Sequence, residues 1–241
     1  MPNKLVIDIE TVGVDFDSLD KTSQKQLENY FRHNTDSEEE AEEQKDKLGF
    51  WPLTGEVIVI GCLNPDSNKG IVFVNPGPSA SSGQAKIELP REIKDSIQVE
   101  VGTEKEILNK FWETAKKYNT FITFNGRGMD APFLMIRSAI HGIRPSKNLL
   151  KNRYSSYQDY DSVHIDLVDQ LTFYGAMRKT FSLHFWTQAF GITSPKEAGI
   201  SGDDVKRLYK EGKIEEIVKY NVRDIEATAE LYRRWEKYLS F

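Results

Sequence analysis

The 241-residue sequence contains only one cysteine, Cys62, so no intrachain disulfide can form. Cys62 lies within the apolar run 57–63, which is typical of a buried strand, and we interpret it as a core residue rather than a nucleophile. No apolar stretch is long enough to span a bilayer, and Met1 to Lys4 leads directly into a strand pattern with no signal or transit peptide. These absences predict a cytoplasmic protein without membrane association.

Charge is distributed unevenly along the chain, whose formal net charge is −5. Residues 36–47 hold seven acidic residues against two lysines, a net of −5, and this segment accounts for the whole imbalance. Residues 131–158 contain no Asp or Glu, and they carry the basic and aromatic residues Arg137, Arg144, Lys147, Lys151, Arg153, Tyr154 and Tyr157. Such a stretch suits a phosphate backbone and its bases, but taken alone it favours an ordinary solvated surface.

Hydrophobic periodicity predicts strands at 4–10, 57–63, 70–75, 120–124 and 163–166. It predicts helices at 22–32, 103–117, 131–141, from about 167, and at 182–190, 203–209 and 213–238. Strands dominate the first half and helices the second, which favours an α/β fold with a mixed five-stranded sheet flanked by helices. We expect a single domain over residues 1–241, with an insertion at about 14–55.

Asp8 and Glu10 lie two residues apart on the first predicted strand, so their side chains point to the same face. The apolar neighbours Ile7 and Ile9 indicate a strand that is buried on both sides. Two adjacent buried carboxylates repel each other, by about 4 kcal/mol at ~4 Å and an effective dielectric of 20, unless a cation lies between them. The alternative is that the strand ends at Asp8 and both acids face water.

Asp130 follows the turn Asn125-Gly126-Arg127-Gly128 and precedes Ala131-Pro132. An Asp directly before a helix with an early proline is a common N-cap, although a capping Asp can keep one oxygen free for a metal or its bound water. Asp166 also precedes a predicted helix, and we interpret it as an N-cap rather than a further ligand. His184 is interpreted as a packed helix residue rather than a base.

Tyr220 and Asp224 lie four residues apart on the last predicted helix and therefore share one face. That face is otherwise apolar, and it comprises Ile217, Tyr220, Asp224, Ala227, Leu231 and Trp235. A lone acid within a stripe that faces the core needs a partner or a metal, so we interpret Asp224 as functional.

Together these residues resemble the DEDD family of 3′–5′ exonucleases, which share a ribonuclease-H-like fold. The three family motifs correspond to Asp8-Ile9-Glu10-Thr11, to the segment Asn125 to Asp130, and to Tyr220-Asn221-Val222-Arg223-Asp224. With a tyrosine at the start of its third motif, the chain resembles the DEDDy subgroup. The residues of its second motif resemble those of the exonuclease domain of family B DNA polymerases. Met129 departs from the family, which usually has Phe or Tyr at this position beside the site. The resemblance does not cover the insertion.

The resemblance implies catalytic roles for Asp8, Glu10, Asp130, Tyr220 and Asp224 and two Mg²⁺ or Mn²⁺ ions held by the four carboxylates. It implies that Asp8 bridges both ions, that Glu10 and Asp224 contact one, and that Asp130 reaches the second through water. Tyr220 would orient the attacking water. Thr11 and Asn125 would contact the terminal nucleotide, although strand termination and a turn explain these two residues equally well.

The expected partner is single-stranded or 3′-terminal nucleic acid, with DNA favoured over RNA, although no residue identifies a reader of the 2′-hydroxyl. A protein partner could dock on the 14–55 insertion, which could also be a lid over the site or a solvated excursion. Two other functions stay open: a catalytically silent binding module on the same fold, and a hydrolase of small phosphodiesters. A role in DNA repair would need a polymerase acting in trans.

Overall fold

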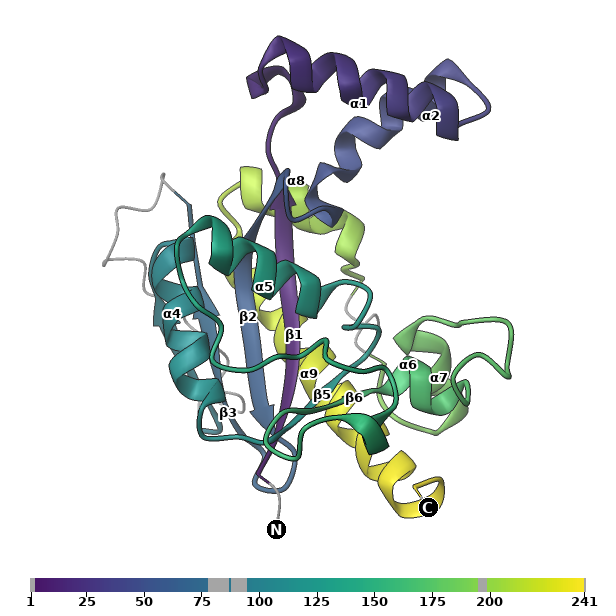
Figure 1. The fold of residues 1–241 in the computed structure, drawn as a ribbon. Helices are drawn as coiled ribbons and strands as arrows, with labels where there is room; N and C mark the ends of the chain where they lie inside the picture. The colour runs from purple at the N-terminus through teal and green to yellow at the C-terminus, as the bar shows by residue number, and fades with distance from the viewer. Residues whose placement is uncertain (1–2, 78–86, 88–94, 195–198, 241) are drawn as a thin grey trace.

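The computed structural model describes residues 3–77, 87, 95–194 and 199–240. A sheet forms the middle layer, with helices on both of its faces (Figure 1). The α-helices of the described residues are α1 (Lys21–Asn34), α2 (Glu38–Gln44), α4 (Glu104–Ala115), α5 (Asp130–Ile140), α6 (Leu167–Leu171), α7 (Leu183–Ala189), α8 (Val205–Lys210) and α9 (Ile214–Tyr238). Short 3₁₀ helices are η1 (Phe16–Ser18), η2 (Lys45–Phe50), η3 (Ser155–Tyr157) and η5 (Gly202–Asp204). None of the helices in this described part of the chain has the length and apolarity needed to cross a membrane.

The sheet has the strand order β4-β3-β2-β1-β5-β6. Its strands are β1 (Lys4–Gly13), β2 (Gly55–Asn64), β3 (Lys69–Val74), β4 (Ile97–Val101), β5 (Thr120–Thr123) and β6 (Val163–Asp166). The pairs β1–β2 and β2–β3 are antiparallel, whereas β1–β5, β5–β6 and β3–β4 are parallel. The predicted mixed α/β sheet flanked by helices is confirmed.

The predicted number of five strands is wrong, because the described residues form six. The missed strand β4 pairs in parallel with β3 and lies at the edge of the sheet. It is only five residues long, and Ile97 is its only fully buried residue. An edge strand that is covered on one side gives a weak alternating pattern, because its remaining positions tolerate polar residues such as Gln98 and Glu100.

Two hydrophobic cores lie on opposite faces of the sheet, and alternation along β1 assigns its side chains to them. Leu5, Ile7 and Ile9 face α4 and α5, while Val6 and Val12 face α9. Asp8 and Glu10 lie in the same alternating register as Val6, so their side chains belong to the face covered by α9.

The insertion is held against the end of β1 rather than extending freely from it. Leu48 is fully buried, and the Thr11 hydroxyl donates to the carbonyl of Gly49 at 2.7 Å. Phe31 stacks on Trp51 with their ring centroids 5.9 Å apart, so the insertion has a small aromatic core of its own. In Figure 1, α1 and α2 lie beyond the upper end of β1.

A buried ionic network ties α4 and α5 to the sheet. The Glu104 carboxylate, whose residue is 4% exposed, accepts hydrogen bonds from the backbone N–H of Val57 at 2.8 Å and from Arg137 at 2.6 and 2.8 Å. The His141 ring lies 2.6 Å from the same carboxylate. Burial alone would raise the pKa of Glu104, but these hydrogen bonds lower it below its usual value.

Arg137→Ala leaves the Glu104 carboxylate buried without its main cation, so we expect the free energy of unfolding to fall by about 3 kcal/mol at pH 7. Since the pKa of Glu104 is lowered by folding, its contribution is present above its unfolded value and is lost as the pH falls through the folded one. Urea denaturation should therefore show a difference between variant and wild type that shrinks below about pH 4. Lys116→Ala, which breaks only the exposed pair with Glu113, is the control. Equal stability of Arg137→Ala and wild type at pH 7 would contradict this account.

Candidate active site

Asp8 and Glu10 extend from β1 towards α9, and Ile7 and Ile9 anchor the other side of the strand. The pairing of β1 with β2 shifts register between Glu10 and Thr11. Such irregularities bend a strand and redirect its side chains, and they are common beside active sites. The local sequence therefore presents two carboxylates at the point where the regular ladder is interrupted.

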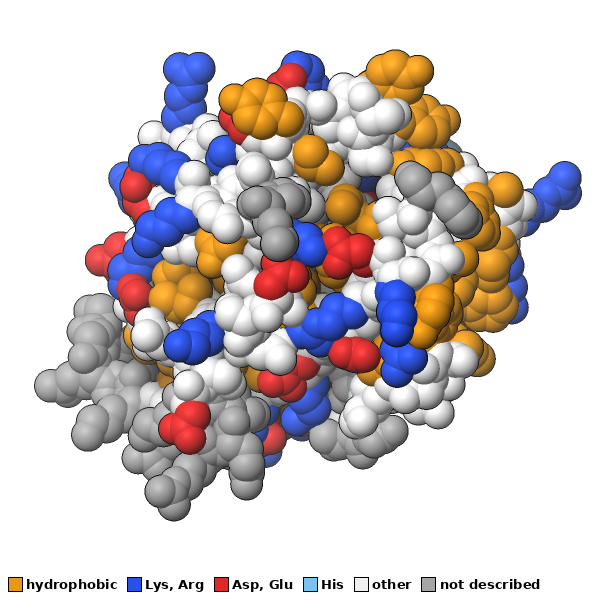
Figure 2. All heavy atoms as spheres, turned by 90° about the horizontal axis from the view of Figure 1, so that it is seen from below, with side chains coloured by type: hydrophobic (Ala, Val, Ile, Leu, Met, Phe, Trp, Pro, Cys, Tyr) orange, Lys and Arg blue, Asp and Glu red, His pale blue; other side chains and the backbone are white. Residues whose placement is uncertain are grey.

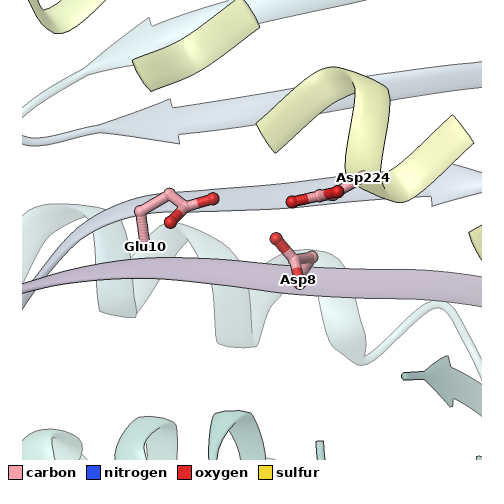
Figure 3. Close-up of side chains that lie close together, drawn as sticks. All are labelled: Asp8, Glu10 and Asp224. Atoms are coloured by element: carbon pink, nitrogen blue, oxygen red, sulfur yellow. The ribbon is translucent and has the colours of Figure 1, made fainter. Parts of the chain in front are cut away.

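Asp224 reaches the same point from α9. The predicted stripe of this helix is confirmed, because Ile217, Tyr220, Ala227, Leu231 and Trp235 are all buried together with Asp224. Figure 3 shows the carboxylates of Asp8 and Glu10 pointing towards that of Asp224. One carboxylate oxygen from each of the three lies within 4.8 Å of the others.

The electrostatic cost of this arrangement appears in the pKa values. The pKa of Asp8 is raised well above its usual value, first by burial and then by the charges of Asp130, Asp224 and Glu10. The pKa of Glu10 is also raised well above its usual value, by burial and then by Asp224. Each carboxylate therefore resists ionisation while the others are charged and no cation is present.

This donor set fits a divalent cation. Three carboxylates that converge from two elements supply hard oxygen ligands, which Mg²⁺ and Mn²⁺ prefer. A doubly charged ion between them would reverse the repulsion that raises their pKa values, so its binding would displace protons. The described residues therefore contain a carboxylate cluster suited to a metal.

Asp130 lies beside this cluster but outside the group of three. It is the first residue of α5, and its Oδ1 accepts a hydrogen bond from the backbone N–H of Ile9 at 3.1 Å. Burial raises the pKa of Asp130 to about 7. The structure thus joins Asp130 to β1 directly between Asp8 and Glu10. Its interpretation as an N-cap is wrong, because α5 begins one residue earlier than predicted and Met129 occupies the N-cap position.

Tyr220 lies one turn before Asp224 on the same face of α9 and borders the cavity in front of the carboxylates. Burial raises the pKa of its hydroxyl far above the usual value, and the charges of Asp224, Glu10 and Asp8 raise it further. The hydroxyl therefore stays protonated at neutral pH and is a hydrogen-bond donor rather than a base.

Asn221, which lies between Tyr220 and Asp224 in the third motif, is a further residue of the site that the sequence analysis does not single out. Its Nδ2 donates to the Asp8 carboxylate at 2.8 Å and to the Asp8 backbone carbonyl at 3.3 Å. The residue is fully buried, and a Cβ added at Gly61 would lie only 2.0 Å from its Oδ1. Glycine at position 61 is therefore required for this amide to lie under Asp8. The available signal is a polar residue three positions before Asp224, next to the apolar stripe of an amphipathic helix.

The turn of the second motif is fixed by Asp166, whose predicted N-cap role is confirmed by a hydrogen bond from the backbone N–H of Val168 at 2.9 Å. Its carboxylate also accepts from the backbone N–H groups of Asn125 at 2.9 Å and Arg127 at 2.8 Å. Asn125 has a φ of +63°, which agrees with its interpretation as a turn residue. His164 is buried, and its Nε2 lies 2.8 Å from the Thr123 hydroxyl. This hydrogen bond links the neighbouring strands β5 and β6.

A cavity of about 760 Å³ opens in front of the carboxylates. One side is formed by the first motif, including Thr11, and by Met129, which therefore does lie beside the site. The other side is formed by residues of the insertion and of α8, namely Glu43, Asp46, Lys47, Gly49, Phe50, Val205, Lys206, Arg207, Lys210 and Glu211. Ion pairs of 2.7 Å join Asp46 to Lys206 and Asp15 to Lys210, so the insertion and α8 form one continuous wall.

The basic residues of the acid-free stretch are largely engaged within the molecule. Besides Arg137, which binds Glu104, Arg153 pairs with Asp169 at 2.5 Å, Lys151 with Asp159 at 2.6 Å and Lys147 with Asp161 at 3.8 Å. Arg137 is thereby excluded as a phosphate ligand, and the basic side chains that border the cavity come from α8 and the insertion instead.

Residues 84–240 match the model of a family described as a predicted 3′–5′ exonuclease related to the exonuclease domain of PolB. The chain belongs to this family. The resemblance to the exonuclease domain of family B DNA polymerases, inferred from three motifs, is thereby confirmed. The first motif lies outside the matched residues, so its place in the site depends on the geometry described above.

Relatives of this PolB-related family member include two archaeal proteins named DNA polymerase 1. That of Saccharolobus solfataricus is 25% identical over 179 residues, which cover 73% of this chain and 19% of the relative. That of Sulfolobus acidocaldarius is 27% identical over 140 residues, covering 57% of this chain and 16% of the relative. The chain thus spans less than a fifth of the length of these relatives.

The fold of this family member is similar to part of a solved structure. The family B DNA polymerase of Pyrobaculum calidifontis matches with a TM-score of 0.57 at 15% identity, covering 98% of this chain and 25% of that one. This likeness confirms the ribonuclease-H-like fold that the motifs imply.

Asn221→Ala removes the amide that orients the Asp8 carboxylate, so we expect the affinity for Mn²⁺ to fall about 10- to 100-fold in calorimetric titrations. Gly61→Ala should weaken Mn²⁺ binding in the same direction, because its added Cβ displaces the same amide without deleting it. Thr228→Ala, a buried polar substitution further along α9, is the matched control and should bind Mn²⁺ normally. Unchanged Mn²⁺ affinity in Asn221→Ala would show that Asp8 needs no such support.

Proposed function

We propose that this protein is a metal-dependent 3′–5′ exonuclease that removes nucleotides from the 3′ end of nucleic acid, DNA being favoured, and releases nucleoside 5′-monophosphates. The convergence of Asp8, Glu10 and Asp224 within 4.8 Å, in a member of the PolB-related exonuclease family, is the observation that carries the proposal. The DNA polymerase names of the relatives support DNA as the substrate.

Asp8, Glu10 and Asp224 are proposed to hold the metal, with Asp130 contributing from beside them. When bound there, two Mg²⁺ or Mn²⁺ ions would stabilise the charge that develops during in-line phosphoryl displacement and lower the pKa of a bound water. Asn221 keeps the Asp8 carboxylate in one orientation, and its hydrogen bonds favour the ionised form that binds a cation. The residues of the chain thus prepare the charge and geometry of the site.

Tyr220 is proposed to orient the attacking water by donating its phenolic hydrogen. An ordinary Tyr hydroxyl is protonated at neutral pH, and burial of Tyr220 favours this neutral form, so the hydroxyl cannot accept a proton from water. The leaving group is the 3′ oxygen of the penultimate nucleotide. Tyr220 therefore contributes to positioning rather than to proton removal.

Thr11 and Asn125 are proposed to contact the terminal nucleotide. Thr11 borders the cavity, but its hydroxyl is already donated to Gly49, which leaves its methyl and backbone groups for the substrate. Asn125 lies in the turn that Asp166 holds through the backbone N–H groups of Asn125 and Arg127, and this turn leads into Asp130.

The insertion is proposed to be a wall of the substrate cavity. Its residues Lys47, Gly49 and Phe50 border the space in front of the carboxylates, and two of its acids, Asp15 and Asp46, pair with lysines of α8. This placement favours the lid interpretation over a surface for a protein partner.

The decisive experiment uses oligonucleotides labelled at either end, incubated with Mg²⁺, Mn²⁺ or EDTA. We expect stepwise loss of nucleotides from the 3′ end. EDTA should abolish this loss by removing the metal, and Asp8→Ala or Asp224→Ala should abolish it by removing a carboxylate that holds the metal. Tyr220→Phe should lower kcat by about 10- to 100-fold while leaving Mn²⁺ affinity nearly unchanged. The control Tyr209→Phe, a tyrosine of α8 that does not border the cavity, should retain activity.

Endonucleolytic products or shortening from the 5′ end would overturn the assignment. Complete inactivity of a folded, Mn²⁺-binding wild type on DNA and RNA would instead favour the catalytically silent module. Hydrolysis of small phosphodiesters alone would favour the third function that the sequence left open.

A further inference from the structure

The turn that follows α6 places two aromatic residues in a conformation that L residues rarely adopt. Phe173 and Tyr174 have φ values of +51° and +55°, and Gly175 follows at +97°. Thr172 is the C-cap of α6, so Phe173 occupies the position after the cap that glycine usually fills. Glycine adopts this backbone conformation without a steric clash, whereas a residue with a Cβ, such as phenylalanine, is strained in it.

Packing explains Tyr174 but not Phe173. The Tyr174 ring lies 4.7 Å from that of Tyr154, and its hydroxyl accepts a hydrogen bond from Gln170 at 2.8 Å. Phe173 is 57% exposed, and no ring contact involves it among the described residues. A strained and exposed aromatic residue that does not support the core is a candidate for ligand contact.

This turn is joined to the metal site through Asp169 of α6. The backbone carbonyl of Asp169 accepts from the N–H of Tyr174 at 2.7 Å. Its carboxylate pairs with Arg153 at 2.5 Å, next to Tyr154, and lies 3.9 Å from Arg127. Arg127 belongs to the turn that leads into Asp130, so a continuous chain of contacts runs from the second motif to the aromatic surface.

The surroundings suit a negatively charged strand that carries aromatic bases. Residues 170–194 contain no Asp or Glu, and they include the exposed cations Arg178 and Lys179. Arg178 forms no ion pair within the described part of the chain, and Lys179 lies over the Phe181 ring at 4.9 Å. Figure 1 shows the segment between α6 and α7 projecting to one side, and Figure 2 shows hydrophobic side chains gathered towards that side in the view from below.

We infer that Phe173, Tyr174 and Tyr154 form a stacking surface for single-stranded nucleic acid, which holds the bases that precede the 3′-terminal nucleotide while Arg178 and Lys179 contact the phosphates. Aromatic stacking is tolerant of sequence, and unpaired cations beside it bind the backbone. This inference rests on the proposed function, because it places the strand relative to the metal site, but its test measures binding without turnover.

The test compares Phe173→Gly with wild type by fluorescence anisotropy, using a labelled oligothymidylate of about ten nucleotides in Ca²⁺ without Mg²⁺. Since glycine relieves the left-handed strain, the variant should melt at or above the wild-type temperature, while the Kd rises about ten-fold. Phe173→Trp should keep the Kd near that of wild type, because it restores a stacking face. Tyr238→Ala, which removes an equally exposed aromatic residue at the end of α9, should leave the Kd unchanged.

An unchanged Kd in Phe173→Gly, or a melting temperature well below that of wild type, would overturn the inference, the latter because it would assign the ring to the fold. Failure of wild type to bind the oligonucleotide would overturn it as well. Oligonucleotide binding that depends on Phe173, without any hydrolysis in Mg²⁺, would support the surface while rejecting the proposed function. Hydrolysis from the 3′ end, with a Kd that does not depend on Phe173, would support the proposed function while rejecting the stacking surface.

Discussion

Mutual repulsion among Asp8, Glu10 and Asp224 is the constraint around which the rest of the structure is arranged. Carboxylate oxygens within 4.8 Å of one another, between a sheet and a helix, are unfavourable unless a cation compensates for their charge. The protein holds them together from two rigid elements, β1 and α9, whose other side chains are committed to two hydrophobic cores. Asn221 and Gly61 then fix the orientation of Asp8. Packing of the two cores thus holds together three carboxylates whose mutual repulsion destabilises the fold.

Local periodicity made much of this architecture predictable. The five predicted strands are present, the stripe of α9 is buried as its spacing indicates, and Asp166 caps α6. Each of these depends on residues close together in sequence. The edge strand β4, the contact between Asn221 and Asp8, and the pairing of Arg137 with Glu104 were not predicted, because each depends on a partner more than thirty residues away or on weak alternation. The grouping of the carboxylates was expected only through the resemblance of three separate motifs.

The regions around the carboxylate cluster divide into a rigid base and more exposed walls. The base comprises β1, α5 and α9, the regular elements from which Asp8, Glu10, Asp130 and Asp224 emerge. Ion pairs join the insertion to α8 in one wall of the cavity, and the turn after α6 contacts Tyr154 at the surface. Reaction geometry needs side chains fixed by packing, whereas contact with a flexible strand needs accessible charges and rings. Both requirements are met by different parts of one chain.

The central claim, that only a divalent cation makes the carboxylate cluster favourable, is tested most directly by thermal unfolding at pH 8 with EDTA and with Mn²⁺. Asp224→Asn keeps the shape of the side chain but removes one of the three charges. We expect this variant to melt above wild type in EDTA, and Mn²⁺ to raise the melting temperature of wild type far more than that of the variant. A variant that melts below wild type in EDTA, together with no response of wild type to Mn²⁺, would contradict the account.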